Sequence, residues 1–206
     1  YELGVKSSWF DNRLMLNGAV YYSDYEGLQV EVNENGKSKT RNVPKVISQG
    51  IEFDLVARPT ESLDIIATYS YNDTEFGTFR FVDGGLPVDW TDNELPLAPQ
   101  KTASLIAQYT VDVNDAVDFI IRGESIYSSD YYYTLRNARF EHQDGFTKFN
   151  MRMTLADNAE VWSVSLFGEN LGDKEHTISR ENVLGTGPIS VRGEPRFWGL
   201  EFSYNL

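Results

Sequence analysis

The chain has 206 residues, no cysteine, a formal net charge of −13 and 14% aromatic residues. Without cysteine it has no disulfide framework and no thiolate metal site, and its acidic balance argues against a nucleic-acid partner, because binding a phosphate backbone requires clustered Lys and Arg. Its longest apolar runs, such as Phe119-Ile120-Ile121, are three or four residues long, which excludes a membrane protein built from transmembrane helices.

Alternation of apolar and polar side chains with a period of two is the dominant pattern along the chain. In the last such segment Trp198, Leu200 and Phe202 fall on one face, while Gly199 and Glu201 fall on the other. About nine segments follow this pattern, and in chain order they cover residues 1–9, 14–25, 51–55, 63–72, 103–110, 117–124, 149–155, 162–169 and 198–206. The pattern predicts an all-β antiparallel fold whose strands each have one apolar and one polar face.

The connections between these segments alternate in length. Short turns rich in turn-forming residues are predicted at 10–13, 58–62, 112–115 and 157–160. The long connections, which show no periodicity of their own, lie at about 28–45, 77–99, 134–146 and 172–195. Such alternation is typical of transmembrane antiparallel β-barrels, which have tight periplasmic turns and extended outer loops. The aromatic content fits the girdles at the two membrane interfaces, and the C-terminus is expected at the periplasmic rim.

A soluble β-sandwich also alternates, with its apolar face turned inward. Aromatic residues near the strand ends, many charges on the polar face and strict alternation of loop length argue against it. A sandwich has no reason to keep all its long loops at one end. A soluble β-sandwich carbohydrate-binding module is therefore the alternative from a different class, and an outer-membrane enzyme or passive porin is the third.

Several short strings resemble the closing strands of TonB-dependent receptors. Each is weak alone, but their order and spacing along one chain make the combination specific. They are YELGVKS at 1–7, FDNRL at 10–14, SQGIEFD at 48–54, LPLAPQ at 95–100, FGENLGDK at 167–174 and GEPRFWGL at 193–200. The alternating aromatic residues at the end resemble the signal read by the barrel-assembly machinery, although Leu206 stands where the family usually ends in Phe.

The resemblance implies an active-transport receptor, not an enzyme, embedded in the lipid of a Gram-negative outer membrane. Such receptors hold an N-terminal plug domain inside a 22-stranded barrel. About nine strands cannot close that barrel, and an open edge in lipid would leave backbone groups unpaired. Residues 1–206 are therefore expected to be the C-terminal portion of the barrel domain, a fragment corresponding to strands fourteen to twenty-two. The plug, the TonB box and the contact with the TonB energy-transducing complex would lie in the missing N-terminal region.

No catalytic or metal-binding constellation is recognisable. His142 and His176 fall in different long loops, and neither has a nucleophile or a metal-ligand spacing beside it. Ser163 and Ser165 lie in a strand without the glycines of a nucleophile elbow. We therefore expect no catalytic residue, no metal and no cofactor.

The charged residues of the polar face are predicted to line the barrel lumen. These residues would interact with water in the lumen, and they would contact the plug in preference to the ligand. These residues are Glu52, Asp54, Arg122, Glu124, Arg152, Glu169 and Glu201.

The long loops carry the ligand-binding hypotheses. The three tyrosines with Arg136 could stack on or pair with an aromatic or anionic ferric chelate, or the tyrosines could form an interfacial girdle. Trp90 could stack on a sugar or a chelate. Arg180 and Arg192 could bind a carboxylate-bearing substrate or pair with neighbouring glutamates. The candidates are Trp90, Tyr131, Tyr132, Tyr133, Arg136, Arg180 and Arg192. The resemblance ranks a ferric siderophore first as the cargo, then haem, cobalamin or an oligosaccharide. The negative charge of the chain counts against an anionic chelate unless local Arg outweighs it.

Overall fold

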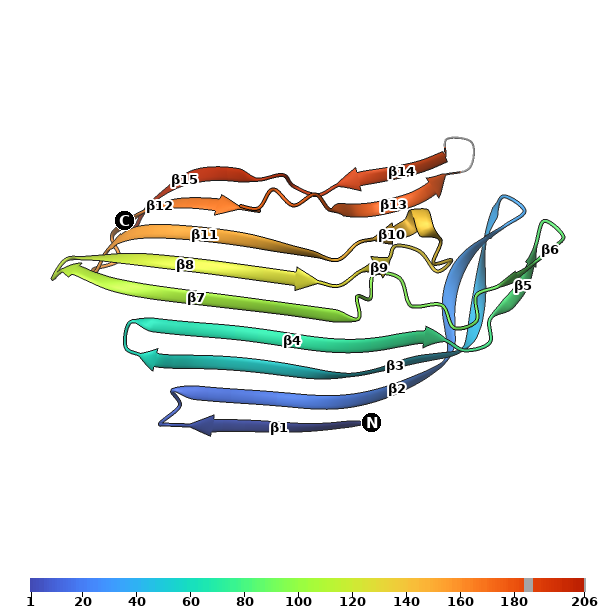
Figure 1. Cartoon of the computed structure of the whole chain (residues 1–206), viewed down its shortest axis with the longest axis horizontal. Coiled ribbons are helices and arrows are strands. Elements are labelled where there is room, and N and C mark those ends of the chain that lie inside the picture. Colours follow the sequence, from blue (N-terminus) through green and yellow to red (C-terminus); the bar gives the residue numbers. More distant parts are fainter. Residues whose placement is uncertain (184–186, 206) are drawn as a thin grey trace.

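The computed structural model describes residues 1–183 and 187–205 and is built almost entirely from antiparallel strands. Its main sheet has nine strands, each paired with its neighbour in chain order (Figure 1). The strands are β1 (Glu2–Trp9), β2 (Leu14–Glu34), β3 (Lys37–Thr60), β4 (Leu63–Phe76), β7 (Lys101–Asn114), β8 (Val117–Ser128), β11 (Phe146–Asp157), β12 (Trp162–Glu169) and β15 (Phe197–Tyr204). This confirms the nine predicted strands and their antiparallel order. Over the described part of the chain, no helix is long and apolar enough to cross a membrane.

The four long connections gather at one end of the sheet, and the short turns lie at the other (Figure 1). Although these connections show no periodicity in the sequence, they contain regular structure. They contain β5 (Arg80–Asp83) paired with β6 (Leu86–Asp89), β9 (Tyr131–Tyr132) paired with β10 (His142–Gln143), the short 3-10 helix η1 (Arg139–Glu141), and β13 (Thr177–Val183) paired with β14 (Gly187–Arg192).

The connection predicted at 28–45 is the continuation of β2 and β3 into a long hairpin. Its turn is Asn35-Gly36, and both residues have positive φ, 53° and 72°. This pair is the strongest short-range hairpin signal, because the favoured two-residue turn requires left-handed backbone at both positions. With 21 and 24 residues, β2 and β3 are far longer than the ~9–11 residues that cross a bilayer. The hairpin therefore projects well beyond the rest of the sheet.

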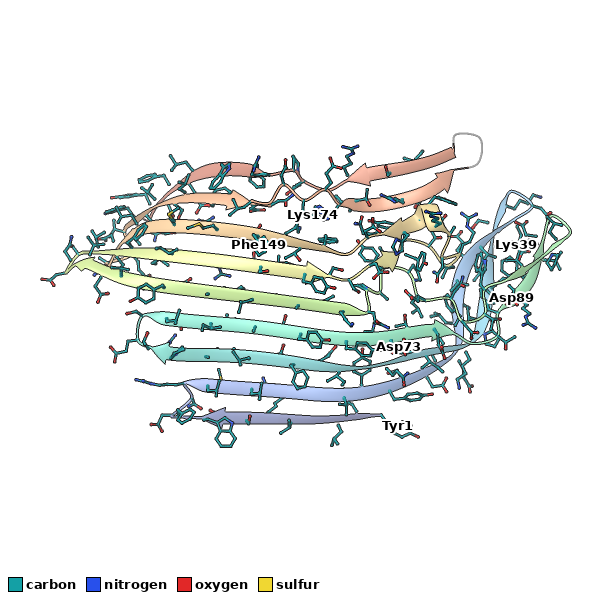
Figure 2. The ribbon with its side chains drawn as sticks, viewed as in Figure 1. Tyr1, Lys39, Asp73, Asp89, Phe149 and Lys174 are labelled. Carbon is teal, nitrogen blue, oxygen red and sulfur yellow. The ribbon has the colours of Figure 1, made fainter. Side chains whose placement is uncertain are left out.

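The register separates an apolar face from a polar face across the whole sheet. Leu105 lies opposite Ala67, and Met153 lies opposite both Ile121 and Leu166, so these side chains share the apolar face. Figure 2 marks Phe149, which is on the same face and is 50% exposed in this chain. Nothing in the described residues covers this face. A soluble sandwich would instead turn it inward against a second sheet.

The buried apolar side chains lie at the loop end and not on the main sheet. We call this group the loop-end cluster; it consists of Val30, Val32, Val43, Val46, Phe76, Phe79 and Phe81. It fills the space between the β2–β3 and β5–β6 hairpins, whose neighbouring positions are marked by Lys39 and Asp89 in Figure 2. Asn35 joins the two hairpins: its backbone N–H donates to Asp83 Oδ1 at 2.7 Å, and its Oδ1 accepts from the Gly84 N–H at 3.1 Å.

Two of the family-like strings hold each other together in space. Asn170, buried and left-handed at φ 49°, donates through Nδ2 to the carbonyls of Lys174 and Glu194 at 3.1 and 3.2 Å. Asp173 Oδ1 accepts from the Arg196 N–H at 3.0 Å. The exit from β12 is thereby tied to the entry into β15, which gives a structural reason for the strings at 167–174 and 193–200.

The two ends of the sheet are open to a labelling test in the full-length protein on intact cells. Cysteines at Lys37, Leu86 and Asp144, which stand in the long connections, are expected to react with a membrane-impermeant maleimide. Cysteines at Glu61 and Asn158, in the short turns, should react only after the cells are lysed. Labelling of the short-turn positions on intact cells would reverse the assigned orientation.

Candidate ligand-binding site

A cavity of about 990 Å³ opens at the loop end of the sheet. The β2–β3 hairpin, the β5–β6 hairpin, the segment after β9 and part of β13 contribute to its wall. Its apolar and aromatic lining consists of Val32, Phe81, Val88, Trp90, Pro96, Tyr133 and Leu135. The remaining described lining is rich in polar and charged groups. Small-molecule sites combine an apolar wall with polar groups that orient the ligand.

Trp90 is held in this wall by the loop-end cluster. Its ring makes edge contacts with Phe81 at 4.9 Å and Phe79 at 5.7 Å between centroids. Its backbone N–H donates to the Phe79 carbonyl at 2.9 Å. One wall of the cavity is therefore rigid and aromatic, because each ring is fixed by its neighbours.

Arg136 reaches the cavity, but its charge is already paired. Its Nη2 lies 2.5 Å from Oε1 of Glu141, whose side chain is only 1% exposed. The Thr134 hydroxyl donates to Glu141 Oε2 at 2.5 Å, and the Arg136 guanidinium lies 5.2 Å from the centre of the Phe140 ring. A buried carboxylate without its cation is strongly destabilising, so Arg136 is needed to compensate Glu141.

The three consecutive tyrosines have different surroundings. Tyr133 lines the cavity, and its hydroxyl donates to the Thr177 carbonyl at 2.6 Å, which links this segment to β13. Tyr131 packs 5.3 Å from Tyr133, and burial raises the pKa of the Tyr131 hydroxyl. Tyr132 lies 5.1 Å from the His142 ring, its partner across the β9–β10 pair. Tyr133 therefore belongs to the described cavity lining, whereas Tyr131 and Tyr132 pack against neighbouring rings outside it.

The remaining predicted arginines lie outside the cavity lining. Arg180 Nη1 donates to the His142 carbonyl at 2.8 Å. The exposed Arg192 lies 3.7 Å from Glu175, which is the glutamate pairing that the sequence suggests as the alternative to ligand binding. Of the seven ligand-binding candidates, the described structure brings three into the wall of the cavity, namely Trp90, Tyr133 and Arg136. A ligand-contacting role for any of the seven stays a prediction.

Sequence reasoning missed the acidic residues of the cavity. Glu31 lies near the tip of the β2–β3 hairpin, Asp83 ends β5, and Glu181 belongs to β13. The turns Asn35-Gly36 and Gly84-Gly85, all with positive φ, would have indicated the hairpins that carry the first two. No local signal indicated that the hairpins meet one another.

The seven charged residues assigned to the lumen all fall on the polar face. Arg122 lies directly opposite Arg152, and Arg152 reaches across β12 to Glu201 with two contacts of 3.2 and 3.3 Å. A smaller hollow of about 400 Å³ lies over this region, and Arg122, Glu124, Arg152 and Glu169 contribute to it. The structure thus gathers these residues on one surface, and their contact with a lumen or a plug stays a prediction.

Comparison with known proteins shows which protein family the chain matches. Residues 1–171 match the family described as TonB dependent receptor-like, beta-barrel. The ferrichrome outer membrane transporter/phage receptor of Escherichia coli is 25% identical over 214 residues, which cover 98% of this chain and 24% of that protein. The ferrioxamine receptor of Yersinia enterocolitica is 30% identical over 182 residues, covering 87% of this chain and 24% of that protein. The chain therefore spans about a quarter of the length of these relatives.

Solved structures have the same fold. The crystal structure of a siderophore receptor from Acinetobacter baumannii matches 98% of this chain and 27% of its own with a TM-score of 0.76 at 20% identity. The ferric yersiniabactin uptake receptor of Yersinia pestis matches 98% of this chain and 29% of its own with a TM-score of 0.79 at 17% identity. At these identities the structures support the architecture of the sheet and its connections.

Proposed function

This chain belongs to the TonB-dependent receptor β-barrel family of the bacterial outer membrane, and we propose that it forms part of a receptor that imports a ferric chelate of the siderophore type. The observation that carries the proposal is the large aromatic-walled cavity, which stands at the long-loop end of the sheet. The names of the ferrichrome and ferrioxamine relatives support the choice of cargo.

The nine strands would supply the C-terminal part of the barrel wall, in line with the prediction that residues 1–206 are the C-terminal portion of the barrel domain. Strands outside this chain would complete the barrel, because a nine-stranded sheet with two free edges leaves unpaired backbone groups in lipid. The apolar face would contact lipid, and the polar face with Arg122 and Arg152 would face the lumen and the plug.

Transport would begin at the loop end. The chelate would bind in the cavity, and its release into the lumen would follow when the TonB energy-transducing complex pulls on the plug. In this mechanism the chain has no bond to make or break. Its residues bind the cargo, hold the external hairpins in position and form a polar surface along which the cargo passes.

The proposal is tested with a clean deletion strain complemented by variants of the full-length receptor. We expect iron-limited growth on a supplied ferric siderophore to require the receptor. Trp90→Ala should reduce uptake of radiolabelled iron about tenfold, since loss of an aromatic contact surface costs roughly a factor of ten in affinity. Trp9→Ala, an exposed tryptophan at the opposite end of the sheet, is the matched control and should leave uptake unchanged.

The amount of assembled receptor must be equal in all strains for this comparison. Unchanged ferric-siderophore uptake in the deletion strain, together with a lost response to haem, cobalamin or an oligosaccharide, would show that the cargo is wrong and the family right.

A further inference from the structure

The cavity has an uneven balance of charge. Its described lining contains four carboxylates, those of Glu31, Asp83, Glu141 and Glu181, and a single cationic side chain, that of Arg136. Because the Arg136 guanidinium is paired with Glu141 at 2.5 Å, it neutralises that carboxylate and not the other three. A ligand that enters the cavity therefore meets an excess of negative charge.

Two of the remaining carboxylates are held in place by the hairpins. Glu31 accepts a hydrogen bond from the Ser38 hydroxyl across the β2–β3 pair, and Asp83 accepts one from the Asn35 N–H at 2.7 Å. Glu181 is exposed at the edge of the same cavity. Carboxylates that are already fixed before the ligand arrives lose little conformational entropy on binding. Little of their favourable interaction with a positive charge is therefore offset by that cost.

The aromatic wall has the same preference. Phe81, Trp90 and Tyr133 present ring surfaces within this cavity, and aromatic faces attract an ammonium or guanidinium group and repel an anion. The molecule itself contains one example of this attraction, because the Arg41 guanidinium lies 5.4 Å from the centre of the Phe81 ring. Aromatic rings and carboxylates together form an environment suited to a positively charged group.

We propose that this cavity selects ferric chelates by charge, binding a chelate that carries a free ammonium group in preference to its neutral counterpart and disfavouring an anionic one. The inference rests on the proposed function and names the class of chelate within it. It replaces the anionic chelate that Arg136 first suggested. The chain as a whole, with a formal net charge of −13, reinforces the preference during approach of the ligand.

A matched series of chelates isolates charge from shape. The probe is a linear trihydroxamate complex of Fe³⁺ with a terminal primary amine, used as the free amine, the N-acetyl derivative and the N-succinyl derivative. The iron centre is the same in all three, and the terminal charge is positive, absent and negative. Binding to the purified full-length receptor and uptake of radiolabelled iron by cells are measured for each.

We expect affinity to fall from amine to acetyl to succinyl, by roughly tenfold at each step at low ionic strength, as for a pair of charges near a protein surface. The ratio should shrink at high salt, because screening acts on the exposed carboxylates.

Two variants locate the effect. The double variant Glu31→Gln with Glu181→Gln keeps side-chain size and hydrogen-bonding capacity, and it should bring the amine and succinyl forms to within about threefold of each other. Asp144→Asn is the control: its side chain is 93% exposed at the same end of the molecule but does not belong to the described cavity lining, and it should leave the ratio unchanged.

The outcomes separate this inference from the proposed function. Equal binding of the three chelates, or tighter binding of the succinyl form, overturns the charge preference while leaving ferric-chelate import intact. A ratio that is unchanged in the double variant overturns the assignment of the preference to this cavity. Failure to bind or import any of the three, while another class of nutrient is imported, overturns the proposed function itself.

Discussion

Met151→Arg and Leu166→Arg are expected to reduce the amount of assembled barrel severely, each costing ~2–4 kcal/mol for a cation near the bilayer midplane. Both residues occupy central positions of their strands, β11 and β12, on the apolar face. Leu166 is 44% exposed in this chain, so its side chain has no protein layer over it here. An arginine at either position would have to reach the interface or draw water into the lipid.

The controls for this experiment lie on the opposite face. Thr68→Arg stands opposite Asp54 and Ser104, and Gln108→Arg stands between Asp64 and Arg122, so both replacements enter a polar surface. The folded fraction in outer membranes is measured by the heat-modifiable shift on gels, and stability by denaturant titration in lipid vesicles. Equal tolerance on the two faces would show that the apolar face is not in contact with lipid.

Gly50→Ala is expected to have the second largest effect. A Cβ at Gly50 would lie 2.1 Å from the Tyr71 carbonyl oxygen and 2.6 Å from the Tyr21 hydroxyl. The Tyr21 hydroxyl donates to Asn72 Oδ1 at 2.8 Å, so it cannot move away without losing that bond. Because one of the obstructing atoms is backbone, the strands must shift, and overpacking of this kind costs about 1–3 kcal/mol or more.

Gly123→Ala is the matched control for this prediction. A Cβ at Gly123 would meet no atom of the described structure within 4 Å, and Gly123 is also in the interior of a strand of the main sheet. Its replacement should be neutral or slightly stabilising, since alanine loses less chain entropy on folding. Comparable denaturation midpoints for the two variants would contradict the close packing at Gly50.

The main sheet could be predicted because its two faces meet different surroundings. Alternation such as Trp198-Gly199-Leu200-Glu201 is imposed along every strand by apolar surroundings on one side and polar ones on the other, and it repeats in sequence with no knowledge of the partner strand. The short turns were predictable for a similar reason, since residues such as Asn12, at φ 68°, tolerate left-handed backbone. These features depend only on residues close together in the chain.

The candidate site could be predicted only in part because it depends on contacts between distant segments. Trp90, Tyr133 and Arg136 are recognisable by residue type, but nothing near Arg136 in the sequence pattern indicates that Glu141 pairs with its guanidinium. The carboxylates of Glu31 and Glu181 are 150 positions apart in the sequence, and they share a cavity only because the hairpins fold toward each other. No pattern within one segment of the sequence indicates that these two carboxylates lie close together in space.

The position of the loop-end cluster has a consequence for how the molecule withstands stress. Apolar contacts such as those in the cluster that contains Val46 and Phe76, which lie opposite each other on β3 and β4, form because water is the alternative environment. The outer surface of the sheet instead exchanges one apolar environment for another. Urea and cold should therefore loosen the hairpins of the loop end while the sheet persists, since both weaken burial from water. Changes in bilayer thickness should act on the sheet and leave the hairpins folded. The same polypeptide is thus stabilised against two different surroundings: water stabilises the hairpins that form the cavity, and lipid surrounds the sheet.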